Sequence, residues 1–179
     1  MSRILLAAGA SAALHKSCDL ASKLSQAGHE VRALLTPRAA QLINPQLFEA
    51  LTGQPAAVDE FGPNRQGAMD HIELARWAEM MLVAPCSADL MARLALGLAG
   101  DLLTTVNLAM ELSVPRVLCP AMNPVMWQAP SVQRHLATLQ GDGWKLLEPG
   151  AGHMACGEAG QGRMAEPEEI VAALAEYLP

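Results

Sequence analysis

Four groups of small and polar residues could take part in chemistry, because each follows an apolar run. They are Gly9-Ala10-Ser11, Thr36, Ser87-Ala88-Asp89 and Ala121-Met122-Asn123. Small residues at a strand-to-helix turn let backbone N–H groups approach a phosphate, which the positive end of the helix dipole favours. The absence of G-x-G-x-x-G favours a mononucleotide over a dinucleotide. These residues alone leave a plain turn open as the alternative, with Thr36 and Ser87 as helix caps.

Two further side chains could move protons. His71 lies at the expected start of a helix, where an imidazole can act as a base or bind a carboxylate, although a surface histidine is the alternative. Cys156 lies in a glycine-rich stretch, an unusual place for a packing cysteine, and an exposed thiol there could donate a proton. Cys18 and Cys119 are expected in the core. The cysteine spacing contains no C-x-x-C pair, so the sequence predicts neither a zinc site nor a disulfide framework.

Short apolar runs alternate with helical patterns along the whole chain. The pattern predicts an α/β protein with one Rossmann-like, doubly wound, mostly parallel sheet and helices on both faces. The chemical groups named above then gather beyond the carboxyl ends of the strands, where ligands bind in such folds. Strands are expected at 4–8, 31–35, 80–84 (ending at Pro85), 116–119 and 144–147, and helices at 12–27, 39–43, 45–51, 71–78, 89–98, 102–112, 132–139 and from Pro167.

Residues 149–165 are rich in glycine, and we expect them to form no regular structure but a mobile flap over the substrate. Residues 1–179 are expected to form one domain around the sheet, with this flap as a part of it. A ligand held at the sheet edge would then be covered by the flap, with Cys156 brought close to it.

The composition also excludes several classes of protein. Of the 179 residues, 51% are hydrophobic and only 17% are charged, which indicates a folded domain rather than a disordered chain. The formal net charge of -6 argues against partners such as nucleic acid or an anionic membrane. The first residues contain neither a leader pattern nor an apolar run long enough to span a membrane, so a cytoplasmic location is expected.

Three segments together resemble the homo-oligomeric flavin-containing cysteine decarboxylase family, and specifically its phosphopantothenoylcysteine decarboxylase branch. Residues 120–127, PAMNPVMW, resemble the P-A-M-N-x-x-M-W motif of that branch. Residues 152–157, GHMACG, followed by GQGRM, resemble its cysteine-containing segment. Residues 85–90, PCSADL, correspond to the P-A-S-A-N-T segment, and His71 falls where the family has its active-site histidine. The resemblance spans nearly the whole chain.

The sequence departs from the family pattern at three places. Asp89 and Leu90 replace Asn and Thr, which is similar to the decarboxylase half of bacterial bifunctional enzymes. Ala10 replaces a frequent glycine in the first loop. The printed sequence ends at Pro179, where bifunctional relatives continue into a ligase domain.

The resemblance implies an enzyme that uses FMN to decarboxylate 4'-phosphopantothenoylcysteine to 4'-phosphopantetheine in coenzyme A biosynthesis. FMN oxidises the cysteinyl thiol to a thioaldehyde, carbon dioxide leaves, and the resulting enethiolate is reduced again. His71 and Cys156 are implied as catalytic, with Cys156 as the proton donor. Asn123, Met126, Ala155 and Arg163 are implied as substrate-binding. The residues implied as FMN-binding are Gly9, Ala10, Ser11, Thr36, Ser87, Ala88, Asp89, Ala121 and Met122.

Family members assemble as trimers, or as dodecamers of trimers, with FMN and the histidine meeting across a subunit boundary. The resemblance therefore implies a homo-oligomer in which His71 acts on a partner's flavin. Three relatives of the same fold remain alternatives: a peptidyl-cysteine decarboxylase, a flavin prenyltransferase and a non-catalytic regulator of a phosphatase. Such regulators typically lose the histidine, asparagine or cysteine that this chain retains as His71, Asn123 and Cys156.

Overall fold

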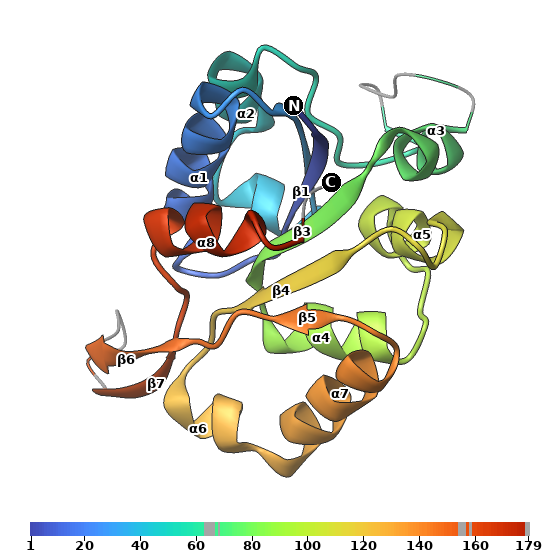
Figure 1. Ribbon diagram of the computed structural model, residues 1–179. Helices are drawn as coiled ribbons and strands as arrows, with labels where there is room; N and C mark the ends of the chain where they lie inside the picture. The colour runs from blue at the N-terminus through green and yellow to red at the C-terminus, as the bar shows by residue number, and fades with distance from the viewer. Residues whose placement is uncertain (63–66, 68, 154–156, 158, 178–179) are drawn as a thin grey trace.

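The centre of the molecule is a five-stranded parallel sheet with the strand order β2-β1-β3-β4-β5 (Figure 1). The computed structural model describes residues 1–62, 67, 69–153, 157 and 159–177. The strand order reverses between β1 and β3, and in open α/β sheets such a switch point is where ligands bind. The strands are β1 (Arg3–Ala8), β2 (Glu30–Leu35), β3 (Met80–Cys86), β4 (Arg116–Pro120) and β5 (Lys145–Leu146).

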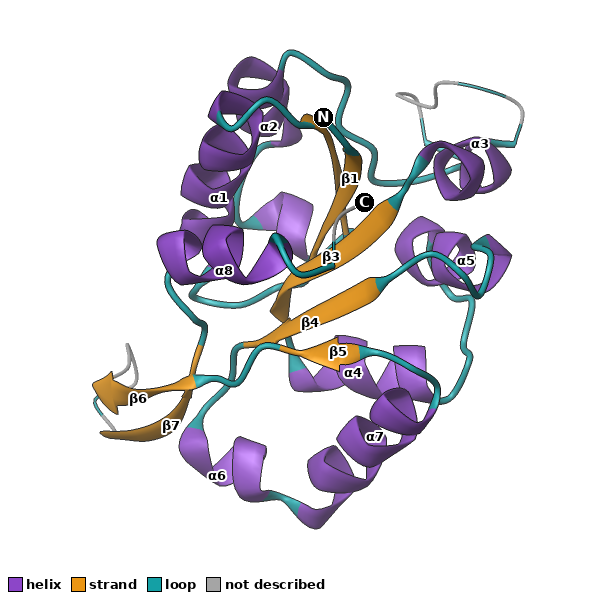
Figure 2. Ribbon diagram, viewed as in Figure 1, coloured by secondary structure: helices purple, strands orange, loops and turns teal. Residues whose placement is uncertain are grey.

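Helices cover both faces of the sheet, which confirms the predicted fold class (Figure 2). One face packs against α1 (Leu14–Gln26), α2 (Pro45–Thr52) and α8 (Pro167–Leu174). The other face packs against α3 (Asp70–Trp77), α4 (Ala88–Ala95), α5 (Leu102–Ala109), α6 (Pro124–Gln128) and α7 (Pro130–Gly141). A short 3-10 helix, η1 (Ala39–Gln41), follows β2.

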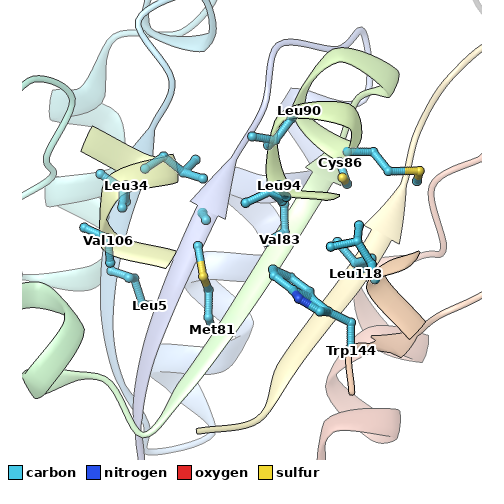
Figure 3. Packing of buried hydrophobic residues seen from close by; sticks show 14 of the residues in the cluster. Leu5, Leu34, Met81, Val83, Cys86, Leu90, Leu94, Val106, Leu118 and Trp144 are labelled. Atoms are coloured by element: carbon cyan, nitrogen blue, oxygen red, sulfur yellow. The ribbon is translucent and has the colours of Figure 1, made fainter. Parts of the chain in front are cut away.

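Strand β3 is buried at every position, because both of its faces are covered by helices. Figure 3 shows Met81 and Val83 in the cluster on the α3–α7 side, together with Leu94 and Trp144. Leu82 belongs to the cluster on the opposite side. The alternation of side chains across a strand divides the core into these two clusters, and it explains why this strand is a continuous apolar run in the sequence.

The prediction that the third strand stops at Pro85 is wrong, because β3 continues to Cys86. Pro85 has no N–H to donate, but its carbonyl oxygen accepts a 2.9 Å hydrogen bond from the Gly9 amide. Cys86 pairs with Pro120 across a shift in register, and its oxygen accepts from the Ala121 amide at 3.0 Å. Backbone pairing at the site therefore extends two residues beyond the predicted end.

Two predicted helices also end earlier than the sequence pattern indicates, at Ala95 and Ala109.

The prediction of no regular structure at 149–165 is also wrong. β6 (Gly150–His153) and β7 (Ala159–Arg163) form an antiparallel hairpin. Backbone bonds between the two strands and a 2.9 Å bond from the Met122 amide to the Gly162 oxygen compensate for the missing side chains. The hairpin lies against α6, a helix that sequence reasoning missed because its five residues are too few for a periodic pattern (Figure 1).

Among the described helices, each is too short or too polar to cross a lipid bilayer.

Candidate functional site

A cavity of about 210 Å³ lies beyond the carboxyl ends of β1, β2 and β3, at the switch point of the sheet. Six of its lining residues were predicted as site residues from the sequence, and three were not. The predicted ones are Ala10, Thr36, Ser87, Ala88, Asp89 and Met126, and the others are Arg38, Leu90 and Arg93. A larger cavity of about 550 Å³ lies at the opposite edge of the sheet, and none of the predicted site residues lines it.

The loop after β1 approaches β3 so closely that residue 9 has to be glycine. A Cβ atom on Gly9 would lie 2.9 Å from the Pro85 oxygen and 3.0 Å from a methyl carbon of Leu90. The Ser11 hydroxyl donates to the Ala121 oxygen at 3.5 Å, which connects the same loop to the end of β4. These contacts join three of the predicted flavin-binding segments into one wall beside the cavity.

Thr36 and Ser87 both line the cavity, and the hydroxyl oxygen of each accepts a hydrogen bond from a backbone amide three residues further along the chain. The Thr36 hydroxyl oxygen accepts from the Ala39 amide at 3.1 Å. The Ser87 hydroxyl oxygen accepts from the Leu90 amide at 3.3 Å, which makes Ser87 the N-cap of α4. The positive end of the α4 dipole therefore faces the cavity, where it favours an anionic group.

Arg93 on the cavity wall forms two ion pairs. Its Nε lies 3.3 Å from a carboxylate oxygen of Asp89, and its Nη1 lies 2.8 Å from a carboxylate oxygen of Asp101. Sequence reasoning missed Arg93, although its spacing of four residues from Asp89 on a helical pattern was a usable signal. Arg38 follows Thr36 by two residues and carried no such signal. Neither arginine was needed to predict the fold, but both place positive charge on the cavity wall.

The predicted substrate residues after β4 lie at the start of α6. Asn123 is the N-cap of that helix, and its side-chain oxygen accepts from the Val125 amide at 2.7 Å and the Met126 amide at 3.4 Å. These bonds fix the orientation of the amide group. Met126 is half exposed and lines the cavity, whereas Met122 and Trp127 are buried in the core. Of these three side chains, only that of Met126 is therefore available to a ligand in the cavity.

His71 lies on α3. It is not among the described residues that line the cavity. Its Nδ1 contacts a carboxylate oxygen of Glu60, a partner that sequence reasoning did not identify. A carboxylate at Nδ1 fixes the orientation of the imidazole ring and leaves Nε2 as the nitrogen available to another partner. Within one chain, His71 and the cavity are separate parts of the predicted site.

Arg163 lies at the base of the β6–β7 hairpin and pairs with Glu166 at 2.5 Å. Glu166 also pairs with Lys16 on α1 at 2.9 Å. The hydrogen bond from Lys16, reinforced by the charges of Lys16 and Arg163, holds the pKa of Glu166 below its usual value. Ala155 and Cys156, the other predicted residues of this segment, lie outside the described residues.

The thiols of Cys86 and Cys119 are fully buried, and burial raises the pKa of both far above the usual range. A thiol that stays protonated is neither a nucleophile nor a metal ligand. These two cysteines are therefore packing residues. In the part of the chain that the structure describes, no group of three His, Cys, Asp or Glu side chains is placed to hold a metal ion.

The family model named Flavoprotein matches residues 1–178. The chain belongs to the flavoprotein family. The match includes all four loops at the carboxyl edge of the sheet, as well as α3 and the hairpin. It confirms the family to which the sequence motifs pointed.

Among curated proteins, this flavoprotein is similar to coenzyme A biosynthesis bifunctional proteins CoaBC. It is 44% identical over 165 residues to that of Haemophilus influenzae, with 92% of this chain and 41% of the relative covered. It is 37% identical over 178 residues to that of Escherichia coli strain K12, with 99% and 43% covered. The chain thus spans about two fifths of the length of these relatives.

Solved flavoprotein structures share the fold over nearly the full chain. A PPC decarboxylase mutant complexed with pantothenoylaminoethenethiol has a TM-score of 0.85 and 32% identity, with 98% of this chain and 97% of the other covered. The FMN binding protein AtHal3 has a TM-score of 0.82 and 33% identity, with 98% and 96% covered. The FMN-dependent cysteine decarboxylase SpaF has a TM-score of 0.80 and 29% identity, with 99% of this chain and 97% of the other covered.

Proposed function

We propose that this flavoprotein is an FMN-dependent decarboxylase that converts 4'-phosphopantothenoylcysteine to 4'-phosphopantetheine in the cytoplasm. The observation that carries the proposal is the cavity at the switch point, whose wall is made by the segments that the family motifs identify. Similarity to CoaBC proteins and to a PPC decarboxylase supports this substrate. Because the chain spans about two fifths of its curated relatives, the proposal concerns only the decarboxylation.

The residues around the cavity fit FMN. Gly9 keeps the first loop close to β3, and small side chains at Ala10 and Ala88 leave room beside the helix N-terminus. Hydroxyl groups of Thr36 and Ser87 line the same space. When bound, FMN supplies the two-electron oxidation of the substrate thiol that lets the neighbouring carboxylate leave. The protein contributes position, charge and proton transfer.

The other predicted residues support the chemistry from two sides. Asn123, whose side-chain oxygen accepts from the α6 backbone, stands three residues before Met126 of the cavity wall, and we propose it as a clamp for the substrate carboxylate. His71, held by Glu60 at Nδ1, presents Nε2 as a base or as a carboxylate partner. Cys156 is proposed as the donor that returns a proton to the product.

We further propose that the active site is shared between copies of the chain, in a trimer or a dodecamer. His71 does not line the cavity of its own chain, which supports its action on the cavity of a partner. Exposed Leu96, Leu98 and Leu108 around the α4–α5 connection offer an apolar surface for such assembly.

The direct test is mass spectrometry of the products after the purified protein is incubated with 4'-phosphopantothenoylcysteine. We expect a product lighter by one carbon dioxide and a yellow protein before reaction. Cys156→Ala should release carbon dioxide but stall before the final product, because its proton donor is missing. Full turnover by this variant would contradict the role of Cys156.

The same assay separates the alternatives. A yellow protein that acts only on a peptide ending in cysteine would be a peptidyl-cysteine decarboxylase, and one that consumes only dimethylallyl phosphate would be a prenyltransferase. A colourless protein inert toward all three substrates would contradict an enzymatic function.

A further inference from the structure

Arg93 lies between two carboxylates, one on the cavity wall and one buried at the start of the next helix. The Asp89 side chain is 58% exposed beside the cavity, whereas the Asp101 side chain is only 7% exposed. The two ion pairs use two different nitrogens of the Arg93 guanidinium: Nε lies toward Asp89 and Nη1 toward Asp101. Arg93 itself lines the cavity.

Asp101 holds Arg93 firmly in this position. It is the N-cap of α5, and one carboxylate oxygen accepts from the Thr104 amide at 2.9 Å and the Thr104 hydroxyl at 2.7 Å. The other oxygen accepts from Arg93 at 2.8 Å. A carboxylate fixed by a capping box gives its partner little freedom, so the guanidinium stays directed toward Asp89 and the cavity.

The charge of Asp89 conflicts with an anion in this cavity. The cofactor and the substrate of the proposed reaction both carry phosphate, and the chain as a whole has a formal net charge of -6. A carboxylate on the wall repels phosphate unless a cation neutralises it. Arg93 is the only cation within ion-pair distance of Asp89 among the described residues, and Arg38 is the other cation of the wall.

We propose that Arg93 is a positioning residue that makes the cavity selective for the phosphate-bearing end of the flavin. By pairing with Asp89, it keeps that carboxylate from repelling the phosphate, and Asp101 keeps it in place. Lysine cannot replace it fully, because a single ammonium group cannot satisfy both carboxylates in the same fork geometry. The inference rests on the proposed function, since it takes FMN to be the occupant.

The test compares the dissociation constants of FMN and riboflavin, measured by flavin fluorescence with the full chain freed of flavin. Riboflavin lacks the phosphate, so it reports on packing around the flavin but not on phosphate repulsion. We expect Arg93→Met to weaken FMN binding about tenfold while riboflavin binding changes less than about twofold. Arg93→Lys should give an intermediate ratio and keeps a charged side chain if the methionine variant folds poorly.

Two carboxylate variants separate the positioning role from a structural one. Asp89→Asn, added to Arg93→Met, should restore most of the lost FMN affinity, because it removes the repelling charge. Asp101→Asn removes the carboxylate that holds Arg93 rather than the one on the cavity wall. It should lower the thermal midpoint and shift the ratio of FMN to riboflavin affinity in the same direction as Arg93→Met, but by less, because Arg93 keeps its charge and its pair with Asp89.

Equal weakening of both flavins by Arg93→Met, or no change in either, would overturn the inference. So would equal affinity of the unmodified chain for FMN and riboflavin, because the cavity would then not recognise phosphate. These results leave the proposed decarboxylase intact. Failure of the unmodified chain to bind either flavin would instead contradict the proposed function itself.

Discussion

The hydrogen atom in place of a side chain at Gly9 determines how closely the first loop approaches β3. A Cβ there would meet the Pro85 backbone oxygen at 2.9 Å, and that oxygen is fixed by a hydrogen bond from the Gly9 amide. Backbone atoms of a central strand cannot rotate aside as a flexible side chain can. The shape of the cavity at the switch point therefore depends on this contact, although Gly9 does not itself line the cavity.

We expect Gly9→Ala to lower the free energy of unfolding by about 1–3 kcal/mol and to weaken FMN binding, because the loop must move away from β3. Denaturant unfolding and flavin fluorescence measure the two effects. Gly141→Ala is the control, since a Cβ on Gly141 meets no atom within 4 Å. An alanine at residue 9 that binds FMN as tightly as the unmodified chain would show that the contact is not required.

The position of a site residue was predictable from the sequence where its motif directly follows a strand. It was less predictable where the residue's interaction partner lies in a different segment of the chain. Thr36, Ser87 and Asp89 could be placed at the cavity because strand ends meet at one edge of a parallel sheet. The contact of His71 with Glu60 joins a residue of α3 to a residue of the preceding loop, eleven positions earlier, and no periodicity links the two. Loop partners of this kind depend on the folded path of the chain.

At the scale of elements, the hairpin is attached to the body of the molecule through β7. A Cβ on Gly160 would lie 2.9 Å from two carbon atoms of Pro124, and the Met122 amide donates to the Gly162 oxygen. The strand therefore lies directly on the segment that contains Asn123. Close packing here connects the position of the hairpin to the predicted substrate clamp.

Gly160→Ala should push β7 away from α6 and break the bond from the Met122 amide. We expect the hydrogen exchange of that amide to accelerate by about tenfold or more, with little change in the exchange of β1 amides. Gly150→Ala is the matched control in β6, because its Cβ would meet only the Arg163 oxygen, at an ordinary 3.8 Å. Unchanged exchange at Met122 would mean that the hairpin tolerates the added methyl group.

The sequence predicted the regular elements of the sheet better than the segments around the site. β1 and β2 are apolar runs with clear ends, so their positions followed from hydrophobic periodicity. The two strands of the β6–β7 hairpin contain no apolar side chain larger than alanine, and the backbone pairing that forms it leaves no periodic trace in residue types. β3 continued past Pro85 because tertiary hydrogen bonds to the next strand and loop outweigh the local effect of proline.

For the whole molecule, the Lys16–Glu166 pair joins α1 to the segment between the hairpin and α8. The pKa of Glu166 is held below the usual 4.5, mainly by the hydrogen bond from Lys16. A carboxyl with a lowered pKa in the folded state stabilises the fold above its unfolded pKa. That contribution disappears as the pH falls through the folded pKa.

Glu166→Gln should therefore lower the free energy of unfolding near neutral pH, by at most about 1 kcal/mol because the pair is partly exposed. The difference from the unmodified chain should vanish in acid, where Glu166 is protonated in both states. Denaturant titrations at a series of pH values measure it. Glu111→Gln serves as the control, because none of the ion pairs between described residues includes Glu111. A difference that persists in acid would contradict the electrostatic explanation.

A shared active site predicts complementation between two inactive variants. His71→Asn leaves the cavity intact, and Asn123→Ala leaves His71 intact. If His71 acts on a partner's cavity, mixed oligomers contain some sites with both residues unmodified, so refolding the two variants together should recover decarboxylation. The mixture should exceed the sum of the separately refolded variants, as measured by carbon dioxide release. Activity no higher than that sum would place both residues in one chain.

The position of Arg93 between Asp89 and Asp101 has a consequence for sequence divergence. A lineage that changes residue 89 to asparagine removes one of the two negative charges that Arg93 neutralises. A positive charge at residue 93 is then no longer needed at the cavity. A lineage that loses the arginine first is left with two opposing carboxylates and no cation between them. We therefore expect positions 89, 93 and 101 to covary in descent, with the change at residue 89 preceding the loss of the arginine.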